Sequence, residues 1–283
     1  MTRTRPTVAD LLATKGTRQM VDVYVETPDE AAAAQEAEVD ILTVPESLFS
    51  PAHRDAAPSA FVVVGLEYGT LATTDEYLRA AFDALRLGAD AVWCAASLAT
   101  VARLRSEGVP VVGHVGLIPP KRTWTGGFKA VGKTAASAID VWNAVQDLES
   151  AGAFAAEIEV VPAAVASAIS ARTSLFMISM GSGSGCDAQY LFATDVLGTN
   201  DGHVPRHAKR YADLGAEMRR IQQMRIEAFG AYVAEVANGA FPDDRQLVDI
   251  DDAEMNAFMA ALPDIDSRRP GNHRRENDGV VPT

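Results

Sequence analysis

The sequence has 283 residues, of which 48% are hydrophobic and 22% are charged, as in an ordinary globular protein with a substantial core. Its formal net charge of −13 argues against nucleic acid as a partner, because phosphate binding needs a basic surface. No apolar run approaches the roughly 18 residues of a membrane helix, and the N-terminus lacks the apolar stretch of a signal peptide. We therefore expect a cytoplasmic protein without a membrane segment, and the two cysteines, Cys94 and Cys186, fit such a reducing compartment.

Short apolar segments alternate with helical patterns along the chain. The segments are rich in β-branched residues and apolar on both faces, as strands buried beneath helices should be. Because strand and helix repeat every 20–25 residues or so, the sequence predicts a parallel sheet. With an unclear eighth strand added, the pattern favours a (β/α)8 TIM barrel with a C-terminal helical extension, and a doubly wound open sheet is the alternative. The strands are expected at 20–25, 39–44, 60–66, 90–95, 109–116, 153–161 and 174–180.

Segment 134–152 is the clearest predicted helix. Thr134 is a suitable N-cap and Gly152 a suitable stop. Its apolar stripe is expected to consist of Ile139, Trp142, Val145 and Leu148.

A long helix is expected at about 206–238, and we assign it, with the barrel, to a domain spanning residues 1–242. A polar tail, 243–283, follows, and its last part, 266–283, has no apolar face and is expected to be mobile or packed on a neighbour. The long helix has more apolar residues than a free surface helix needs. It therefore predicts a homo-oligomer, on the basis of Met218, Ile221, Met224, Ile226 and Phe229.

Residues 127–134, "GFKAVGKT", match the phosphate-loop pattern of Gly, four residues, Gly, Lys and Thr. A phosphate loop should follow its strand directly, but ten residues separate this motif from the strand that ends near Gly116. We interpret the motif as a long strand-to-helix loop, in which Lys133 and Thr134 begin the helix. His203 and His207 lie in polar segments and are expected to face solvent.

Candidate site residues are those near the carboxyl ends of predicted strands or just after them, because the chemistry of a (β/α)8 barrel lies at that face. Cys94 lies near such an end, but it is expected to pack rather than react. The candidates are Glu26, Glu46 with Ser47, Gly65, Trp93, His114, Glu159 and the glycine-rich "GSGSG" at 181–185.

Several segments, taken in order, resemble ketopantoate hydroxymethyltransferase. The first is "VPVVGHVGLIPPKRTWTGGFKAVGKT" (109–134), which matches the Gly-His-x-Gly-Leu and Gly-Gly-x-Lys motifs of the family. The resemblance implies a (β/α)8 barrel of the phosphoenolpyruvate mutase and isocitrate lyase superfamily and covers roughly residues 7–242. The other matching segments are 7–16, 148–170, 181–198, 209–214 and 231–242.

The resemblance also implies an activity. The family transfers a hydroxymethyl group from methylenetetrahydrofolate to the carbon next to the carbonyl of a 2-oxo acid, 2-oxoisovalerate. A magnesium ion chelates the 2-oxo acid and stabilises the enolate. The family commonly forms a decamer.

Carried over one position at a time, the family's functional residues are only partly present. The histidine falls on His114 and the glutamate on Glu159, the two catalytic candidates. The first metal aspartate and its serine fall on Glu46 and Ser47, candidates for substrate binding, with Glu46 also the one weak metal ligand. The remaining metal aspartate, lysine and outer glutamate fall on Gly65, Trp93 and Ala95.

These departures predict a weakened or lost magnesium site, in which Glu67 is a possible substitute ligand. Glu157 is a further acid near the site if it points inward together with Glu159. Trp93 is expected to form an apolar wall of the substrate site, and Lys121 with Arg122 to bind an anionic substrate or cofactor tail. We therefore expect an aldol-type enzyme with an altered 2-oxo acid substrate. The alternatives are the ketopantoate enzyme proper and a non-catalytic barrel that serves as a binding or scaffold protein.

Overall fold

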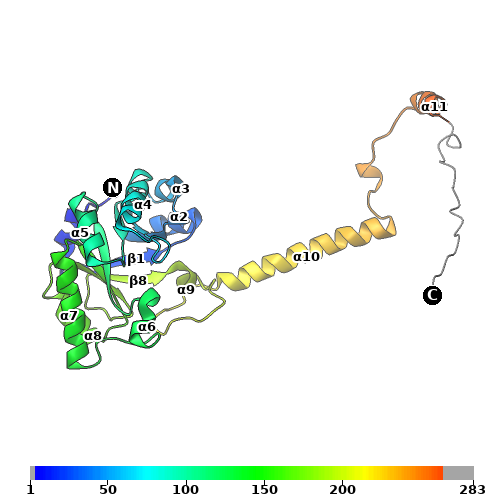
Figure 1. Cartoon of the computed structure of the whole chain (residues 1–283). Helices are drawn as coiled ribbons and strands as arrows, with labels where there is room; N and C mark the ends of the chain where they lie inside the picture. Colours follow the sequence, from blue (N-terminus) through cyan, green and yellow to red (C-terminus); the bar gives the residue numbers. More distant parts are fainter. Residues whose placement is uncertain (1–3, 264–283) are drawn as a thin grey trace, which may run out of the picture. The chain divides into compact units, whose positions relative to one another are not determined.

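A computed structural model describes residues 4–263, and its eight parallel strands close into a barrel in sequence order (Figure 1). This arrangement confirms the predicted TIM barrel and rules out the doubly wound open sheet. The strands are β1 (Met20–Tyr24), β2 (Ile41–Pro45), β3 (Phe61–Gly65), β4 (Ala91–Trp93), β5 (Val111–Gly116), β6 (Ala155–Glu159), β7 (Phe176–Met180) and β8 (Ala188–Phe192).

Helices surround this barrel, and further helices follow β8 along the chain. Those between consecutive strands are α2 (Pro28–Glu36), α3 (Pro51–Ala56), α4 (Thr74–Arg86), α5 (Leu98–Ser106), α7 (Ala135–Ser150) and α8 (Ala163–Ser170). The β5–α7 connection also holds η1 (Pro119–Lys121) and α6 (Arg122–Thr125). The remaining helices are α1 (Val8–Thr14), α9 (Ala193–Leu197), α10 (Leu214–Asn238), η2 (Asp244–Gln246) and α11 (Asp252–Ala261).

The eighth strand, which the sequence left unclear, is β8. It follows β7 through the loop 181–187, in which no helix forms. Its register aligns Ala188 with Ile178 on one side and with Met20 on the other, and so it closes the barrel. The missing helix removed the strand–helix alternation that identified the other strands.

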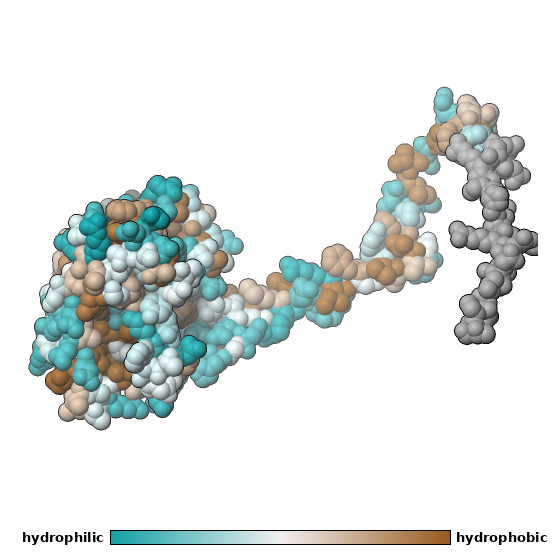
Figure 2. All heavy atoms as spheres, in the orientation of Figure 1, coloured by the Kyte–Doolittle hydropathy of each residue, from teal (hydrophilic) through white to brown (hydrophobic). Residues whose placement is uncertain are grey.

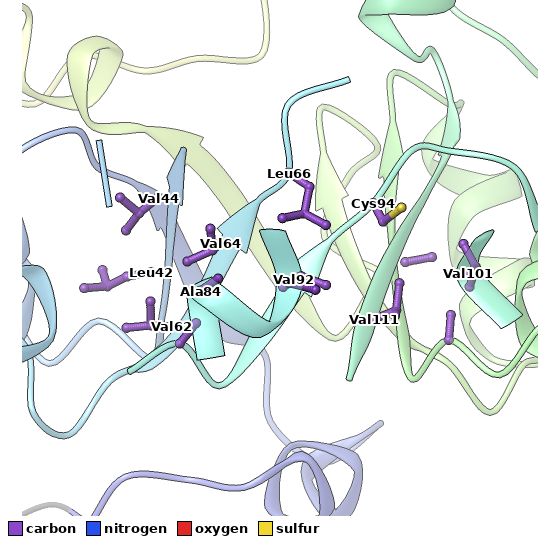
Figure 3. Close-up of a cluster of buried hydrophobic side chains, with 14 of the residues drawn as sticks. Leu42, Val44, Val62, Val64, Leu66, Ala84, Val92, Cys94, Val101 and Val111 are labelled. Carbon is purple, nitrogen blue, oxygen red and sulfur yellow. The ribbon is translucent and has the colours of Figure 1, made fainter. Parts of the chain in front are cut away.

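Alternation of side chains along each strand produces two separate cores. One set points outward and packs under the helices, as Leu42, Val62 and Val92 do (Figure 3). The other set points into the barrel, where Phe61 and Phe176 fill the interior at the N-terminal ends of β3 and β7. Leu11 of α1 is 1% exposed and belongs to this inner cluster.

Helix α7 has the predicted cap, but its buried face differs from the predicted stripe. Thr134 accepts a hydrogen bond from the Ser137 amide at 3.2 Å, and the helix ends two residues before Gly152. The buried residues are Val141, Val145 and Leu148, whereas Ile139 is 56% exposed. Residues three apart on an α-helix are offset by about 60° around its axis, because a full turn takes 3.6 residues. Over the three steps from Ile139 to Leu148 the offset reaches about half a turn, so these two residues lie on opposite faces.

The described chain divides into two compact units, one ending at Arg219 and the other starting at Arg220. Helix α10 begins at Leu214, because residues 206–213 of the predicted helix form an irregular segment. Apolar and polar residues alternate along this helix (Figure 2). Among the helices of residues 4–263, none combines the length and apolarity that crossing a membrane requires. The predicted tail segment 266–283 lies outside the described residues.

Candidate active site

A cavity of about 470 Å³ opens at the carboxyl ends of the barrel strands. Its floor is polar: Thr43 and His114 line it, and the buried Asp22 lies behind Thr43, from which it accepts a hydrogen bond. Its walls combine aromatic rings with carboxylates. The aromatic residues are Tyr24, Tyr68, Trp93, Tyr190 and Phe192, and the carboxylates are Glu67, Glu157 and Glu159.

His114 lies between two glutamates at the base of this cavity. Its Nδ1 is 3.0 Å from Oε2 of Glu157, and its Nε2 is 3.2 Å from Oε2 of Glu159. Nε2 is also 2.8 Å from the carbonyl oxygen of Leu117, which can only accept a hydrogen bond. All three side chains are less than one-tenth exposed. Both nitrogens of the ring therefore face oxygen atoms, an arrangement that suits a protonated imidazolium.

Glu157 points inward because it lies two residues before Glu159 on β6, and strand residues two apart share a face. Its Oε2 accepts a hydrogen bond of 2.9 Å from Nε1 of Trp93. The indole also packs edge-on against the ring of His114, with the ring centroids 5.6 Å apart. Trp93, Glu157 and His114 thus form one connected group.

The two carboxylates determine the charge of His114. Burial lowers the pKa of His114, but hydrogen bonds and charge from Glu157 and Glu159 outweigh burial and raise the pKa from 6.5 to about 9. At neutral pH the imidazole is therefore protonated. A positive charge lies at the base of the cavity.

Two further buried groups have raised pKa values: Asp22, behind Thr43, and Tyr190 of the cavity wall. Burial and the charge of Glu157 raise the pKa of Asp22 well above its usual range, although Thr43 donates a hydrogen bond to it at 3.2 Å. Burial, followed by the charges of Glu157 and Asp22, also raises the pKa of Tyr190. Burial therefore shifts Asp22 toward its protonated, uncharged form.

The predicted site residues fall into two groups in the structure. Trp93, His114 and Glu159 line the cavity together. Glu46 lies at the edge, where its Oε2 accepts a hydrogen bond of 3.3 Å from the amide of Glu67, and Ser47 is exposed. Lys121 follows two prolines that line the cavity and donates to the carbonyl oxygen of Ala95 at 2.7 Å.

The sequence pointed less clearly to the residues of the barrel floor. Asp22 is a single acid inside the apolar segment "MVDVY", and that contrast was the available signal. Tyr190 and Phe192 lie on β8, the strand that sequence patterns did not resolve. Cys94 is 1% exposed and burial raises its pKa, which agrees with the expected packing role.

The residues at the barrel mouth do not fit the magnesium ion that the resemblance implies. Magnesium needs oxygen ligands, usually one or two carboxylates. Gly65 has no side chain, and Trp93 contributes an N–H donor instead of a lone pair. Within residues 4–263, no group of three or more His, Cys, Asp or Glu side chains is arranged to hold a metal ion.

Known proteins resemble this chain along most of its length. A family described as ketopantoate hydroxymethyltransferase matches residues 50–244. The 3-methyl-2-oxobutanoate hydroxymethyltransferase 1 of Methylibium petroleiphilum is 32% identical over 286 residues, which cover 91% of this chain and 94% of that protein. The corresponding protein of Pyrobaculum calidifontis is 34% identical over 86% of this chain and 97% of its own length. That of Nitratidesulfovibrio vulgaris is 41% identical over 165 residues, 58% of this chain and 52% of its own length.

Solved structures share the fold at low sequence identity. A 2,3-dimethylmalate lyase of the PEP mutase/isocitrate lyase superfamily has a TM-score of 0.52 at 12% identity, over 91% of this chain and 100% of that chain. The carboxyl transferase domain of Rhizobium etli pyruvate carboxylase has a TM-score of 0.51 at 10% identity, over 66% of this chain and 42% of that chain. The barrel, the matched segment 50–244 and the two nearly full-length relatives agree, and the chain belongs to the ketopantoate hydroxymethyltransferase family of enzymes.

Proposed function

We propose that this protein makes or breaks a carbon–carbon bond next to the carbonyl of a 2-oxo acid, and that it does so without a bound metal ion. The observation that carries this proposal is the imidazolium of His114, which lies between Glu157 and Glu159 at the base of the cavity. An enolate is the intermediate of aldol-type chemistry, and a fixed positive charge stabilises it.

Glu159 is the base in this proposal. Its carboxylate takes the proton from the carbon next to the carbonyl. The electron pair of that C–H bond becomes the C=C bond of the enolate, and the π pair of the carbonyl moves onto its oxygen. The enolate carbon then attacks a one-carbon unit at the aldehyde level as the carbonyl re-forms, and the C=O π pair of that unit moves onto its own oxygen, which takes the proton from Glu159. In the reverse direction the same groups break that bond. Glu159 suits this role because it lines the cavity, and the positive ring of His114 lies 3.2 Å away, close to where the enolate charge develops.

His114 supplies the charge, and Glu157 with Trp93 holds it in place. Nδ1 of His114 is fully buried and faces Glu157 at 3.0 Å, and Nε2 faces Glu159 and Leu117, so the ring acts on the cavity mainly through its charge. Glu157 keeps that charge in place, and the indole N–H of Trp93 fixes the orientation of Glu157. We assign Glu157 and Trp93 as positioning residues.

Only a few side chains are available to bind the substrate. A 2-oxo acid carries a carboxylate, and the cavity already holds Glu67, Glu157 and Glu159. Lys121, whose Nζ lies 5.3 Å from the centre of the Tyr68 ring, is the cation that we assign to the substrate carboxylate. Glu46 and Ser47 lie on the loop after β2, beside the cavity wall at Pro45, and we assign them supporting contacts at its edge.

The test is exchange of deuterium into the carbon next to the carbonyl, followed by NMR across a panel of 2-oxo acids. Exchange needs no one-carbon donor, so the result does not depend on methylenetetrahydrofolate. We expect exchange that EDTA does not abolish, and a loss of about 100-fold or more in Glu159→Gln and in His114→Ala.

Matched variants and metal additions separate the outcomes. Asp83→Asn, a change to an exposed acid on α4, should leave exchange unchanged. No exchange with any member of the panel, with or without magnesium, would favour a non-catalytic binding barrel. Exchange that appears only with stoichiometric, tightly bound magnesium would refute the metal-free mechanism.

A narrower candidate is the ketopantoate reaction itself. It is favoured by the two relatives that match along nearly their whole length, both of which are named 3-methyl-2-oxobutanoate hydroxymethyltransferase. The test is growth of a strain that lacks its own ketopantoate enzyme. Growth without added pantothenate would assign 2-oxoisovalerate as the substrate, whereas exchange activity without such growth would assign a different 2-oxo acid.

A further inference from the structure

A second cavity, of about 430 Å³, lies next to the active-site cavity and is lined by basic rather than acidic side chains. Three basic side chains line it: Lys133, Arg206 and His207. None of the described acidic side chains, residues 4–263, lines it. The whole chain has a formal charge of −13, so an acid-free basic cavity departs sharply from the general surface. We refer to it as the basic cavity.

Within the described part of the chain, these basic side chains have no protein partner. Among the ion pairs and side-chain hydrogen bonds of residues 4–263, none involves Lys133, Arg206 or His207, whereas most other arginines of the barrel unit are paired with acids, as Arg54 is with Asp90 at 2.6 Å. The charged ends of Lys133 and Arg206 are exposed and are therefore available to an anion that enters the cavity.

The backbone adds donors to the same place. Helix α8 starts at Ala163, which lines the basic cavity, and its N-cap is Pro162, which offers no capping side chain. The first N–H groups of a helix have no partner within the helix, and the helix dipole makes that end positive. An anion in the basic cavity would satisfy both the open N–H groups and the three side chains.

Glycines bring these groups together. Gly181 has φ +69°, and a Cβ at that position would lie 2.7 Å from the ring of His207. A Cβ on Gly183 would lie 2.4 Å from Cβ of Ala163 at the start of α8. The loop after β7 can therefore touch His207 and α8 only because it lacks side chains there.

The basic cavity and the active-site cavity share the same end of the barrel. Glu159 and Met180 line the active-site cavity, and the next residues in the chain, Val160 and Gly181, line the basic cavity. The ends of β6 and β7 thus separate a cavity with three carboxylates from a cavity lined by basic side chains.

We propose that the basic cavity is a binding site for an oxyanion, a carboxylate or a phosphate group of a small molecule. Lys133 and Arg206 neutralise the oxyanion, His207 closes the site and the N-terminus of α8 donates hydrogen bonds to it. The site gives Lys133 of "GFKAVGKT" a role in anion binding that does not involve a phosphate loop, because Thr134 is already used to cap α7.

The experiment is isothermal titration calorimetry of the full chain at low ionic strength, with inorganic phosphate in one series and glutarate in another. We expect saturable binding with one site per chain for at least one of the two probes. The tighter probe identifies the natural ligand group as a phosphate or a carboxylate. Lys133→Ala and Arg206→Ala should each weaken binding about tenfold or more.

Lys129→Ala is the matched control, because Lys129 is an exposed lysine of the same loop that does not line the basic cavity. Its affinity for both probes should equal that of the wild type. Absence of saturable binding at millimolar concentrations of both probes would overturn the proposal. Equal weakening in Lys129→Ala and Lys133→Ala would also overturn it, because binding would then reflect diffuse surface charge. The measurement needs no turnover, so its outcome is independent of the proposed reaction.

Discussion

His114 is the residue whose charge most affects both the proposed chemistry and the stability of the barrel. Its pKa is about 9 in the folded state against 6.5 for the free side chain, so the folded protein holds the proton more tightly. This stabilisation is complete below pH 6.5 and is lost as the pH rises through about 9. At one pKa unit per 1.36 kcal/mol, it amounts to at most about 3 kcal/mol.

We expect Glu157→Gln to remove part of this effect. The pKa of His114 should fall by about one unit or more, and the unfolding free energy should decrease less between pH 6.5 and 9 than in the wild type. NMR titration of the ring and urea unfolding at several pH values measure the two quantities. Trp93→Phe, which removes the N–H donor but keeps the carboxylate, should leave the pKa of His114 high. An unchanged pKa in Glu157→Gln would show that Glu159 alone keeps the ring protonated.

Asp22 provides an opposite case, because its folded-state pKa is raised and the acid form is buried. Its contribution to stability is present below the unfolded pKa of about 3.8 and is lost as the pH rises. We expect Asp22→Asn to gain stability relative to the wild type between pH 4 and pH 7, because asparagine does not ionise. Urea unfolding at both pH values measures the difference.

Asp187 is the control for this prediction, because it is equally buried but paired. It accepts a hydrogen bond from Lys15 Nζ at 2.7 Å and from the amide of Met177 at 2.8 Å. Asp187→Asn should therefore lose roughly 1–3 kcal/mol at pH 7. A loss of similar size in Asp22→Asn would contradict the neutral form that we assign to Asp22.

At the scale of elements, the start of α7 shows why "GFKAVGKT" does not form a phosphate loop. The hydroxyl of Thr134 accepts from the Ser137 amide at 3.2 Å, and Ser137 bonds back to the Thr134 amide at 3.0 Å. This reciprocal cap satisfies the donors that a phosphate would otherwise need.

We expect Thr134→Ala to destabilise the protein by about 1 kcal/mol, because the first turn of α7 loses its cap. The measurement is the midpoint of urea unfolding at constant slope. Thr123→Ala, a change to an exposed threonine in α6 that caps no helix, should have no effect. Equal stabilities of the two variants would show that the cap contributes nothing.

At the scale of the whole molecule, α10 carries apolar residues that a surface helix does not need. Met224 is 55% exposed and Phe229 is 71% exposed. Exposed apolar groups of this size mark interaction surfaces. We propose that these residues pack in a homo-oligomer.

Light scattering at micromolar concentration tests this assembly. We expect a mass that is a multiple of 30.0 kDa and a shift toward the monomer when Met224 and Phe229 are both replaced by glutamate. Gln222→Glu, a polar change on the same helix, should leave the mass unchanged. A monomeric wild type would refute the proposal.

The sequence alone determined the alternation of parallel strands and helices, and it pointed to the family, for a physical reason. Parallel strands buried on both faces must be apolar along their whole length, and helices must alternate with them, so both leave a local pattern. His114 and Glu159 were identified in the same way, because each lies near the carboxyl end of a predicted strand and in a segment that resembles the family.

Only the tertiary structure decided which side chains share the cavity and what charge they carry. Glu157 meets Trp93 and His114 across β4, β5 and β6, and contacts between residues this far apart in the chain leave no local pattern. β8 escaped prediction because no helix precedes it, and Tyr190 was missed with it. The basic cavity brings Lys133 together with Arg206 and His207. From the sequence, His207 was expected only to face solvent. The pattern of buried apolar residues is local and determines the fold, whereas the charge of a site depends on the distances between side chains, which only the closed barrel determines.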